Sequence, residues 1–197
     1  MSEQMPKMHQ LPCDTPIGEI RFGDTQDPDI ATRVAAMFAE DQGVRSGGEI
    51  DWEAEHARGT ARMIEIMGYL AEGRIVAAET LYHAAMIFQH GNCPEHLQVT
   101  AQLAERAIQQ GYQPAAWLYA ASIDRYLMNT GKPQKFGTQY FAQGDEDFYL
   151  WPVDPATTDE ERLRYNVPTL EEAKQRAVEM NKLWKQQAST LKNDKDT

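Results

Sequence analysis

The sequence predicts a mainly α-helical protein whose helices pack side by side as an antiparallel array. Three glycines, Gly91, Gly111 and Gly131, lie twenty residues apart, and each ends a segment of helical periodicity. A proline follows each glycine within three positions, as expected where one helix stops and the next begins. The composition of the 197-residue chain is that of one soluble globular core, because 42% of its residues are hydrophobic and 25% are charged.

Two further helices are expected before this array. Asp27-Pro28 combines an N-cap residue with a proline at the first helical position. Asp51 can cap a second helix, which ends at Gly73. Residues 1–26 are expected to form an extended N-terminal segment, so the helical domain begins at residue 27.

Small side chains would let the helices of the array approach one another closely. They are Ala84, Ala85, Ala104, Ala107, Ala116, Ala120 and Ala121. Such packing is similar to the helical hairpins of tetratricopeptide or Sel1 repeats. Because the period here is one helix and only three helices share it, we expect a small array rather than a true solenoid.

The pattern changes after the last helix of the array. Residues 138–142 and 147–151 are short aromatic-rich runs on either side of a polar turn, which favours a β-hairpin or, equally, an irregular aromatic loop. Prolines then predict an extended crossing. Thr169 and Glu172 form a capping box that opens a final helix.

The segment from Trp184 onward is charged and lacks an apolar face. We therefore expect a single helical domain over residues 27–187 and a frayed tail over 188–197.

Charge and cysteine content limit the partners and the compartment. The net charge of -11 repels phosphate backbones and anionic lipids, so neither nucleic acid nor a membrane is expected as a partner. No signal-like start or membrane-length apolar run occurs, which predicts a cytoplasmic protein. Cys13 and Cys93 show neither a disulfide framework nor a zinc-ligand spacing, so we expect two unrelated thiols in a reducing compartment.

The most informative segment is the polar loop of residues 131–140. It gathers two amides, two ammonium groups and a hydroxyl directly after a helix that carries Asp124 and Arg125. Loops of this chemistry usually serve function. His83 and His90 lie seven residues apart on an earlier helix, so they share a face but are separated by about 10 Å, too far for one metal ion.

The first and third helices of the array should run parallel. Because each helix and its connection take twenty residues, a residue of the first helix should lie beside the residue about forty positions later in the chain. His83 then lies level with Asp124, and His90 lies level with the start of the polar loop. A histidine flanked by a carboxylate, a guanidinium and amide donors suits acid–base catalysis on an anion. We therefore predict His83, His90 and Asp124 as catalytic residues. The predicted substrate-binding residues are Arg125, Gln89, Gln134, Lys135, Thr138 and Gln139.

The same residues have structural explanations that the sequence leaves open. A histidine in an alanine-rich helix is often a hydrogen-bonded core residue. Asp124 and Arg125 could pair with neighbouring helices, and the loop amides could cap helix ends. Zinc-protease, P-loop, nucleophile-elbow and dinucleotide motifs do not occur, so no metal and no cofactor is predicted.

As a set, these motifs resemble an uncharacterised bacterial family that is known only as a domain of unknown function. The similarity covers roughly residues 38 to 175. It rests on Asp41-Gln42 with Arg45, Gln89-His90-Gly91, Asp124-Arg125 and the Pro-Gln-x-Phe-Gly-Thr-Gln motif of residues 133–139. The resemblance implies no mechanism, but it adds Asp41, Gln42 and Arg45 to the predicted site.

Three hypotheses follow. The first is a metal-independent acid–base enzyme acting on a small polar or anionic metabolite or a peptide group, with hydrolysis, elimination and isomerisation all open. The second is a non-catalytic module that presents the same groove to a peptide or protein. The third is a mononuclear metal enzyme that uses His83 or His90 with Glu79 or Asp124. The sequence predicts no oligomeric state.

Overall fold

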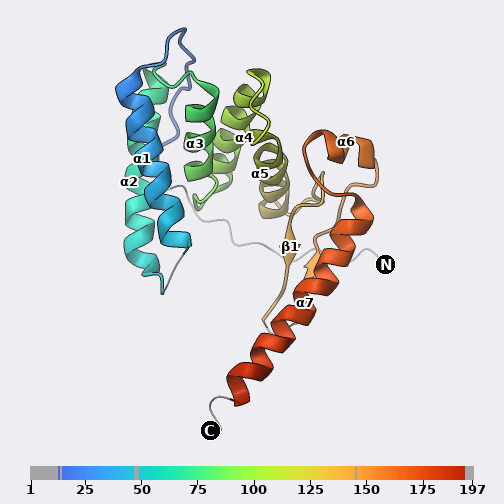
Figure 1. The fold of residues 1–197 in the computed structure, drawn as a ribbon. Coiled ribbons are helices and arrows are strands. Elements are labelled where there is room, and N and C mark those ends of the chain that lie inside the picture. The colour runs from blue at the N-terminus through green and yellow to red at the C-terminus, as the bar shows by residue number, and fades with distance from the viewer. Residues whose placement is uncertain (1–12, 14, 47–48, 145, 194–197) are drawn as a thin grey trace.

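The computed structural model describes residues 13, 15–46, 49–144 and 146–193, and these are mainly helical. Five helices come first: α1 (Pro28–Arg45), α2 (Trp52–Ala71), α3 (Ala78–Phe88), α4 (Pro94–Gln109) and α5 (Ala115–Asn129). They lie side by side, with α3 between the α1–α2 pair and α4, and α5 against α4 (Figure 1). The prediction of a mainly α-helical chain is confirmed.

The helix starts follow the local capping chemistry. The Asp27 side chain accepts hydrogen bonds from the backbone N–H groups of Asp29 and Ile30 at the start of α1. Asp51 accepts from Ala54 N–H at the start of α2. Each carboxylate satisfies donors that have no partner within the first helical turn.

The three evenly spaced glycines serve two different purposes. Gly111 and Gly131 follow α4 and α5 with φ of +86° and +70°, the left-handed conformation expected of a glycine cap. Gly91 does not have a positive φ. A Cβ atom at Gly91 would overlap the ring of His96, so glycine is required there for close packing rather than for backbone conformation.

The main core lies where α1 to α5 meet. Val34, Ile66, Leu81, Phe88 and Leu103 are fully buried in it. Alanines of α3, α4 and α5 are buried among them, which allows the close helix approach that the sequence predicted. They include Ala84, Ala104, Ala107 and Ala115.

The chain after α5 forms a small hairpin and a short helix. Strands β1 (Tyr140–Phe141) and β2 (Tyr149–Leu150) pair antiparallel, so the hairpin alternative is confirmed. The short helix α6 (Asp159–Arg164) lies where the sequence predicted an extended crossing. Thr158 caps it by accepting a hydrogen bond from Glu161 N–H, a signal that could have been found in the sequence.

The last helix, α7 (Leu170–Asn193), packs against β2 and extends away from the array (Figure 1). Its capping box forms as predicted: Thr169 N–H donates to the Glu172 carboxylate at 2.8 Å, and Glu172 N–H donates back to Thr169 Oγ1 at 3.3 Å. Helical structure continues to Asn193, although fraying was predicted from residue 188. Ala188, Leu191 and Lys192 in this stretch are good helix formers, which can extend a helix without an apolar face. Residues 194–197 lie outside the described part.

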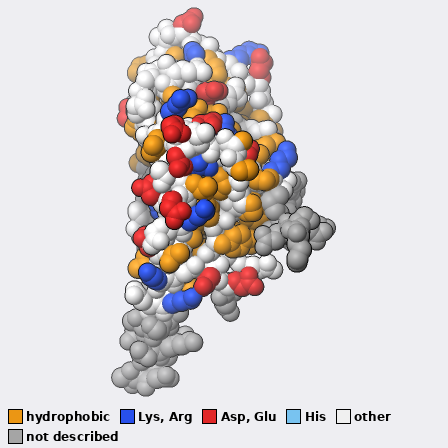
Figure 2. Space-filling view, turned by 90° about the vertical axis from the view of Figure 1, so that its right-hand side faces the viewer, with side chains coloured by type: hydrophobic (Ala, Val, Ile, Leu, Met, Phe, Trp, Pro, Cys, Tyr) orange, Lys and Arg blue, Asp and Glu red, His pale blue; other side chains and the backbone are white. Residues whose placement is uncertain are grey.

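The face of the molecule on the side of α6 and α7 mixes hydrophobic, acidic and basic side chains (Figure 2). Exposed hydrophobic residues of α7 include Val178, Leu183 and Trp184. None of the helices within the described ranges combines the length and the apolar character needed to cross a bilayer.

The described part of the N-terminal segment, before α1, contains no helix or strand. Arg21 N–H donates to the carbonyl oxygen of Leu70, and Gly23 N–H donates to that of Gly73, which attaches the segment to the end of α2. The segment leads to Cys13, which forms a disulfide with Cys93 over a Cα–Cα distance of 5.1 Å. The prediction of two unrelated thiols is therefore wrong. Residues 1–12 and 14 lie outside the described part.

Candidate functional site

A cavity of about 480 Å³ opens between the end of α1, the first half of α2 and the end of α3. Seven of the twelve lining residues have polar side chains, namely two histidines, three carboxylates, an arginine and an asparagine. The lining residues are Asp41, Arg45, Trp52, Glu53, Glu55, His56, Gly59, Met63, Ile87, His90, Gly91 and Asn92. The cavity has the size of typical small-molecule sites.

At its centre, His90 lies beside Asp41. Nδ1 of His90 is 2.9 Å from Oδ2 of Asp41, and the carboxylate is 1% exposed whereas the imidazole is 22% exposed. Arg45 Nη2 lies 3.2 Å from Oδ1 of the same carboxylate, and Gln42 Nε2 donates to Oδ2 at 3.0 Å. The three residues that the resemblance added, Asp41, Gln42 and Arg45, thus lie together with His90.

Burial and ionic contacts act in opposite directions on Asp41. Burial raises the pKa of its carboxyl group, but the contacts with His90 and Arg45 outweigh burial and hold the pKa below the ordinary value. Asp41 is therefore ionised at neutral pH. The Asp41 carboxylate lies on the Nδ1 side of the His90 ring.

A buried ion-pair cluster supports this carboxylate from α2. Glu55 Oε1 lies 2.9 Å from Arg62 Nη1, and Arg62 Nη1 is 3.6 Å from Asp41 Oδ1. Glu55 also pairs with Arg58 at 3.0 Å. Both Glu55 and Arg62 are buried.

Glu55 and Arg62 were not among the site residues predicted from the sequence. The available signal was spacing. Residues 55, 62 and 66 lie on one face of α2, and Ile66 on that face belongs to the core.

Asp124 does not join this site. It is fully buried, and its carboxylate accepts hydrogen bonds from the backbone N–H groups of Lys135, Phe136 and Thr138 and from Thr138 Oγ1, at 2.7 to 2.9 Å. Burial raises its pKa, and these donors offset part of that effect. The expectation that Asp124 orients a catalytic histidine is not met, because Asp41 occupies that position beside His90.

The predicted loop amides are occupied by the backbone of their own segment. Gln134 is fully buried, donates to the carbonyl oxygens of Gln139 and Trp151, and accepts from Gln139 N–H. The Gln139 amide donates to Thr138 Oγ1 at 2.9 Å. These bonds hold the loop and the hairpin together, and none of these side chains lines the cavity beside His90.

Two of the predicted substrate-binding residues, Lys135 and Arg125, are positively charged and make contacts outside the cavity. Lys135 pairs with Glu161 of α6 at 2.7 Å. Arg125 donates from Nη1 to the carbonyl oxygen of Gln89 at 3.0 Å and from Nε to Gln139 Oε1 at 3.3 Å. Arg125 therefore connects the loop to the end of α3, where His90 lies, but it is not part of the cavity lining.

His83 lies in α3 and His90 lies two residues after that helix ends, so they do not share a helix face; both contact α1 rather than α5. The His83 ring stacks on Phe38 of α1 with a centroid distance of 4.3 Å. Burial lowers the pKa of His83, and the charge of Glu79 opposes that shift. His83 does not line the cavity, so its predicted catalytic role has no support from its position.

Among the described residues, three ligand-type side chains have the spacing of a metal site. They are Cys13, Cys93 and His96, and the group contains neither His83 nor His90. The third hypothesis, a metal ion held by one of those histidines with Glu79 or Asp124, therefore has no geometric support within the described ranges.

Comparison with known proteins finds no matching family model, no matching curated protein and no matching solved structure.

Proposed function

We propose that the cavity is an acid–base site that acts on a small polar or anionic molecule, with His90 as the proton-transfer group. The observation that carries this proposal is the 2.9 Å contact between His90 Nδ1 and a buried, ionised Asp41 at the wall of a cavity of about 480 Å³. A carboxylate behind an imidazole orients the ring. Proton transfer by such a residue accelerates reactions by about 10²- to 10⁴-fold.

Arg45 is the lining residue best placed to bind an anionic or polar group of a substrate. Arg45 lines the cavity, and its side chain is 24% exposed. Three carboxylates, Asp41, Glu53 and Glu55, line the same cavity, and those of Asp41 and Glu55 are already paired with arginines. The partly exposed guanidinium of Arg45 supports binding of a carboxylate, a phosphate or a polarised carbonyl oxygen.

The alternative function is a binding module for a peptide or protein. The observation that favours it is Trp52, which lines the cavity and is 64% exposed. Exposed aromatic residues beside a polar cavity are common anchors for peptides.

Three finer expectations remain proposals. They are the similarity of α3 to α5 to tetratricopeptide or Sel1 hairpins, the resemblance to the bacterial family of unknown function, and the cytoplasmic location. The Cys13–Cys93 disulfide counts against a cytoplasmic location, because disulfides persist mainly in oxidising compartments.

Proton NMR of the purified protein with pools of small esters, amides, hydroxy acids and phosphate esters tests the proposal. We expect slow conversion of at least one pool by the wild type and a loss of about 10²-fold or more in His90→Asn. His56→Asn, which alters the other cavity histidine, is the matched control and should keep most of the turnover. Conversion that survives in His90→Asn would remove the acid–base assignment.

The same samples separate the two functions. If no pool is converted but peptides shift the resonances of cavity residues, and Trp52→Ala abolishes those shifts, the binding module is favoured.

A further inference from the structure

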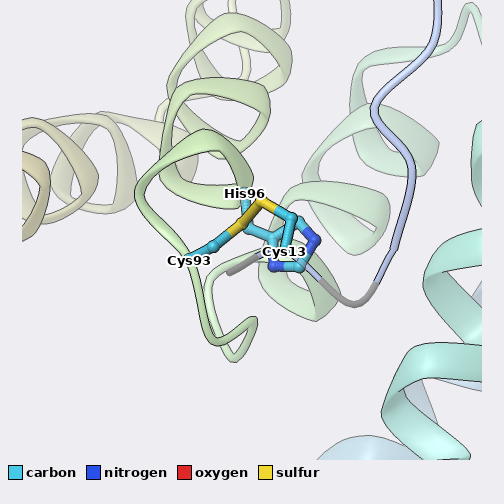
Figure 3. A group of neighbouring side chains, drawn as sticks. All are labelled: Cys13, Cys93 and His96. Atoms are coloured by element: carbon cyan, nitrogen blue, oxygen red, sulfur yellow. A yellow bond between two sulfur atoms is a disulfide. The ribbon is translucent and has the colours of Figure 1, made fainter. Parts of the chain in front are cut away.

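A second group of chemically reactive side chains lies at the start of α4, outside the cavity. The Sγ atoms of Cys13 and Cys93 and a ring nitrogen of His96 all lie within 4.8 Å of one another, and Figure 3 shows the imidazole beside the disulfide. Cys93 is 1% exposed and His96 is fully buried.

These residue types match the preferences of a soft divalent metal ion. Two thiolates and an imidazole form a common ligand set for Zn²⁺. Oε2 of Glu95 lies 3.1 Å from Cys13 Sγ, so a carboxylate is available at the same place. We propose that reduction of the Cys13–Cys93 disulfide converts this group into a zinc site with Cys13, Cys93 and His96 as ligands and Glu95 or water in the fourth position.

The backbone holds two of the ligands and leaves the third adjustable. Cys93 is the N-cap residue of α4, and His96 lies in the first turn of that helix. Gly91 provides the space for the His96 ring. Cys13 lies in the segment before α1, outside any helix, so its sulfur can move away from Cys93 by the roughly 2 Å that two Zn–S bonds of about 2.3 Å require.

The start of α4 also suits a thiolate at Cys93. The N-terminus of a helix stabilises thiolates through its unpaired N–H groups. Cys93 lies at that position in α4, so its reduced form is suited to metal binding.

Reduction of the Cys13–Cys93 disulfide requires two electrons and two protons, which a dithiol can supply. The dithiol transfers two electrons and two protons to the disulfide, which becomes two thiols, while the dithiol becomes a disulfide. Zn²⁺ then displaces the two thiol protons. The disulfide and the metal site exclude each other because both use the same two sulfur atoms. The chain would therefore be cross-linked by a disulfide under oxidising conditions and by a metal ion under reducing conditions.

Cobalt and zinc titration of the full chain tests this inference. The protein is reduced with dithiothreitol, freed of reductant under anaerobic conditions and titrated with Co²⁺ and then Zn²⁺. We expect one Co²⁺ per chain with thiolate-to-cobalt charge-transfer absorption and tetrahedral ligand-field bands, release of two protons, and displacement by Zn²⁺. The oxidised protein has the same sequence and should bind at least about 100-fold more weakly.

Variants assign the ligands. Cys13→Ser should lose at least about 100-fold in affinity and part of the charge-transfer band, whereas Glu95→Gln should keep the band and lose about tenfold. His56→Asn, a histidine of the cavity, should bind like the wild type. If reduction unfolds the chain, Zn²⁺ should restore the helical circular dichroism signal.

The inference is overturned if the reduced protein shows no charge-transfer band, if Cys13→Ser or the oxidised protein binds as tightly as the reduced wild type, or if Zn²⁺ fails to refold a chain that reduction has unfolded.

Discussion

Arg125 of α5 donates a hydrogen bond from Nη1 to the carbonyl oxygen of Gln89, and so connects the polar loop to the residue before His90. This guanidinium is partly buried, and burial lowers its pKa. This hydrogen bond gives Arg125 a role in positioning the end of α3, although Arg125 does not line the cavity.

Arg125→Met should lower the free energy of unfolding by about 2 kcal/mol, because it leaves the Gln89 carbonyl and the Gln139 amide oxygen without this donor. Urea unfolding measures the change. Arg58→Met removes an arginine that is 51% exposed and should have a much smaller effect. Equal effects of the two substitutions would show that the Arg125 contacts contribute little.

Asp41→Asn should weaken the dependence of stability on acid pH. The pKa of Asp41 is lowered in the folded state, so its stabilising effect is complete above the unfolded value of about 3.8 and is lost as the pH falls through the folded value. Wild type and variant should therefore differ most near neutral pH and converge in acid. Urea unfolding over a series of pH values checks this, with the exposed Asp147→Asn as control. A difference that stays constant with pH would contradict the ionic role.

Asp124→Asn should destabilise the protein by about 2 to 4 kcal/mol. The carboxylate oxygens of Asp124 now accept hydrogen bonds from N–H and O–H donors. The amide nitrogen of asparagine is itself a donor, so it would face these donors without accepting from them. Turnover per folded molecule should not change if the site lies at His90. Thermal unfolding measures the stability of the wild type and the variant, and the turnover of both proteins is measured with the same NMR assay. A large loss of turnover without loss of stability would restore Asp124 as a catalytic residue.

His83 should make the protein less stable below about pH 6.5. Burial lowers its pKa in the folded state, so the unfolded chain takes up a proton first and stability declines as the pH falls from about 6.5 to the folded value. His83→Leu should remove this part of the pH dependence. Exposed His56→Gln serves as the control and should retain it. An unchanged pH profile in His83→Leu would be evidence against a buried neutral histidine.

Reduction of the disulfide should lower stability. The bridge spans a sequence separation of 80 residues, for which chain entropy predicts up to about 4.5 kcal/mol. Urea unfolding with and without reductant, in the presence of a chelator, measures the loss. Cys13→Ser should resemble the reduced wild type and should not respond to reductant. Overlapping curves for oxidised and reduced wild type would contradict the prediction.

Local chemistry was predictable from the residues. The caps at Asp27, Asp51 and Thr169 and the left-handed glycines Gly111 and Gly131 all have the roles expected, because each depends on neighbours within one helical turn. The hairpin was one of two alternatives, and α6 was missed although Thr158 marks its start.

The site was predictable only in part. His90, Asp41, Gln42 and Arg45 lie together in the structure. The sequence instead placed His83 level with Asp124 and His90 level with the polar loop, because a repeat of twenty residues gives the level of a side chain along the helix axis but not its direction around it. Both histidines contact α1, so His83 meets Phe38 and His90 meets Asp41.

Contacts between distant segments were set by packing. Asp124 is surrounded by the N–H groups of a loop that closes over it, and Cys13 reaches Cys93 because an extended segment crosses the array. Periodicity and capping depend on residues close in the chain and can be read from their order. Helix rotation, loop closure and cross-links depend on the burial of many distant side chains at once, and a single sequence does not specify which of these pairs will meet.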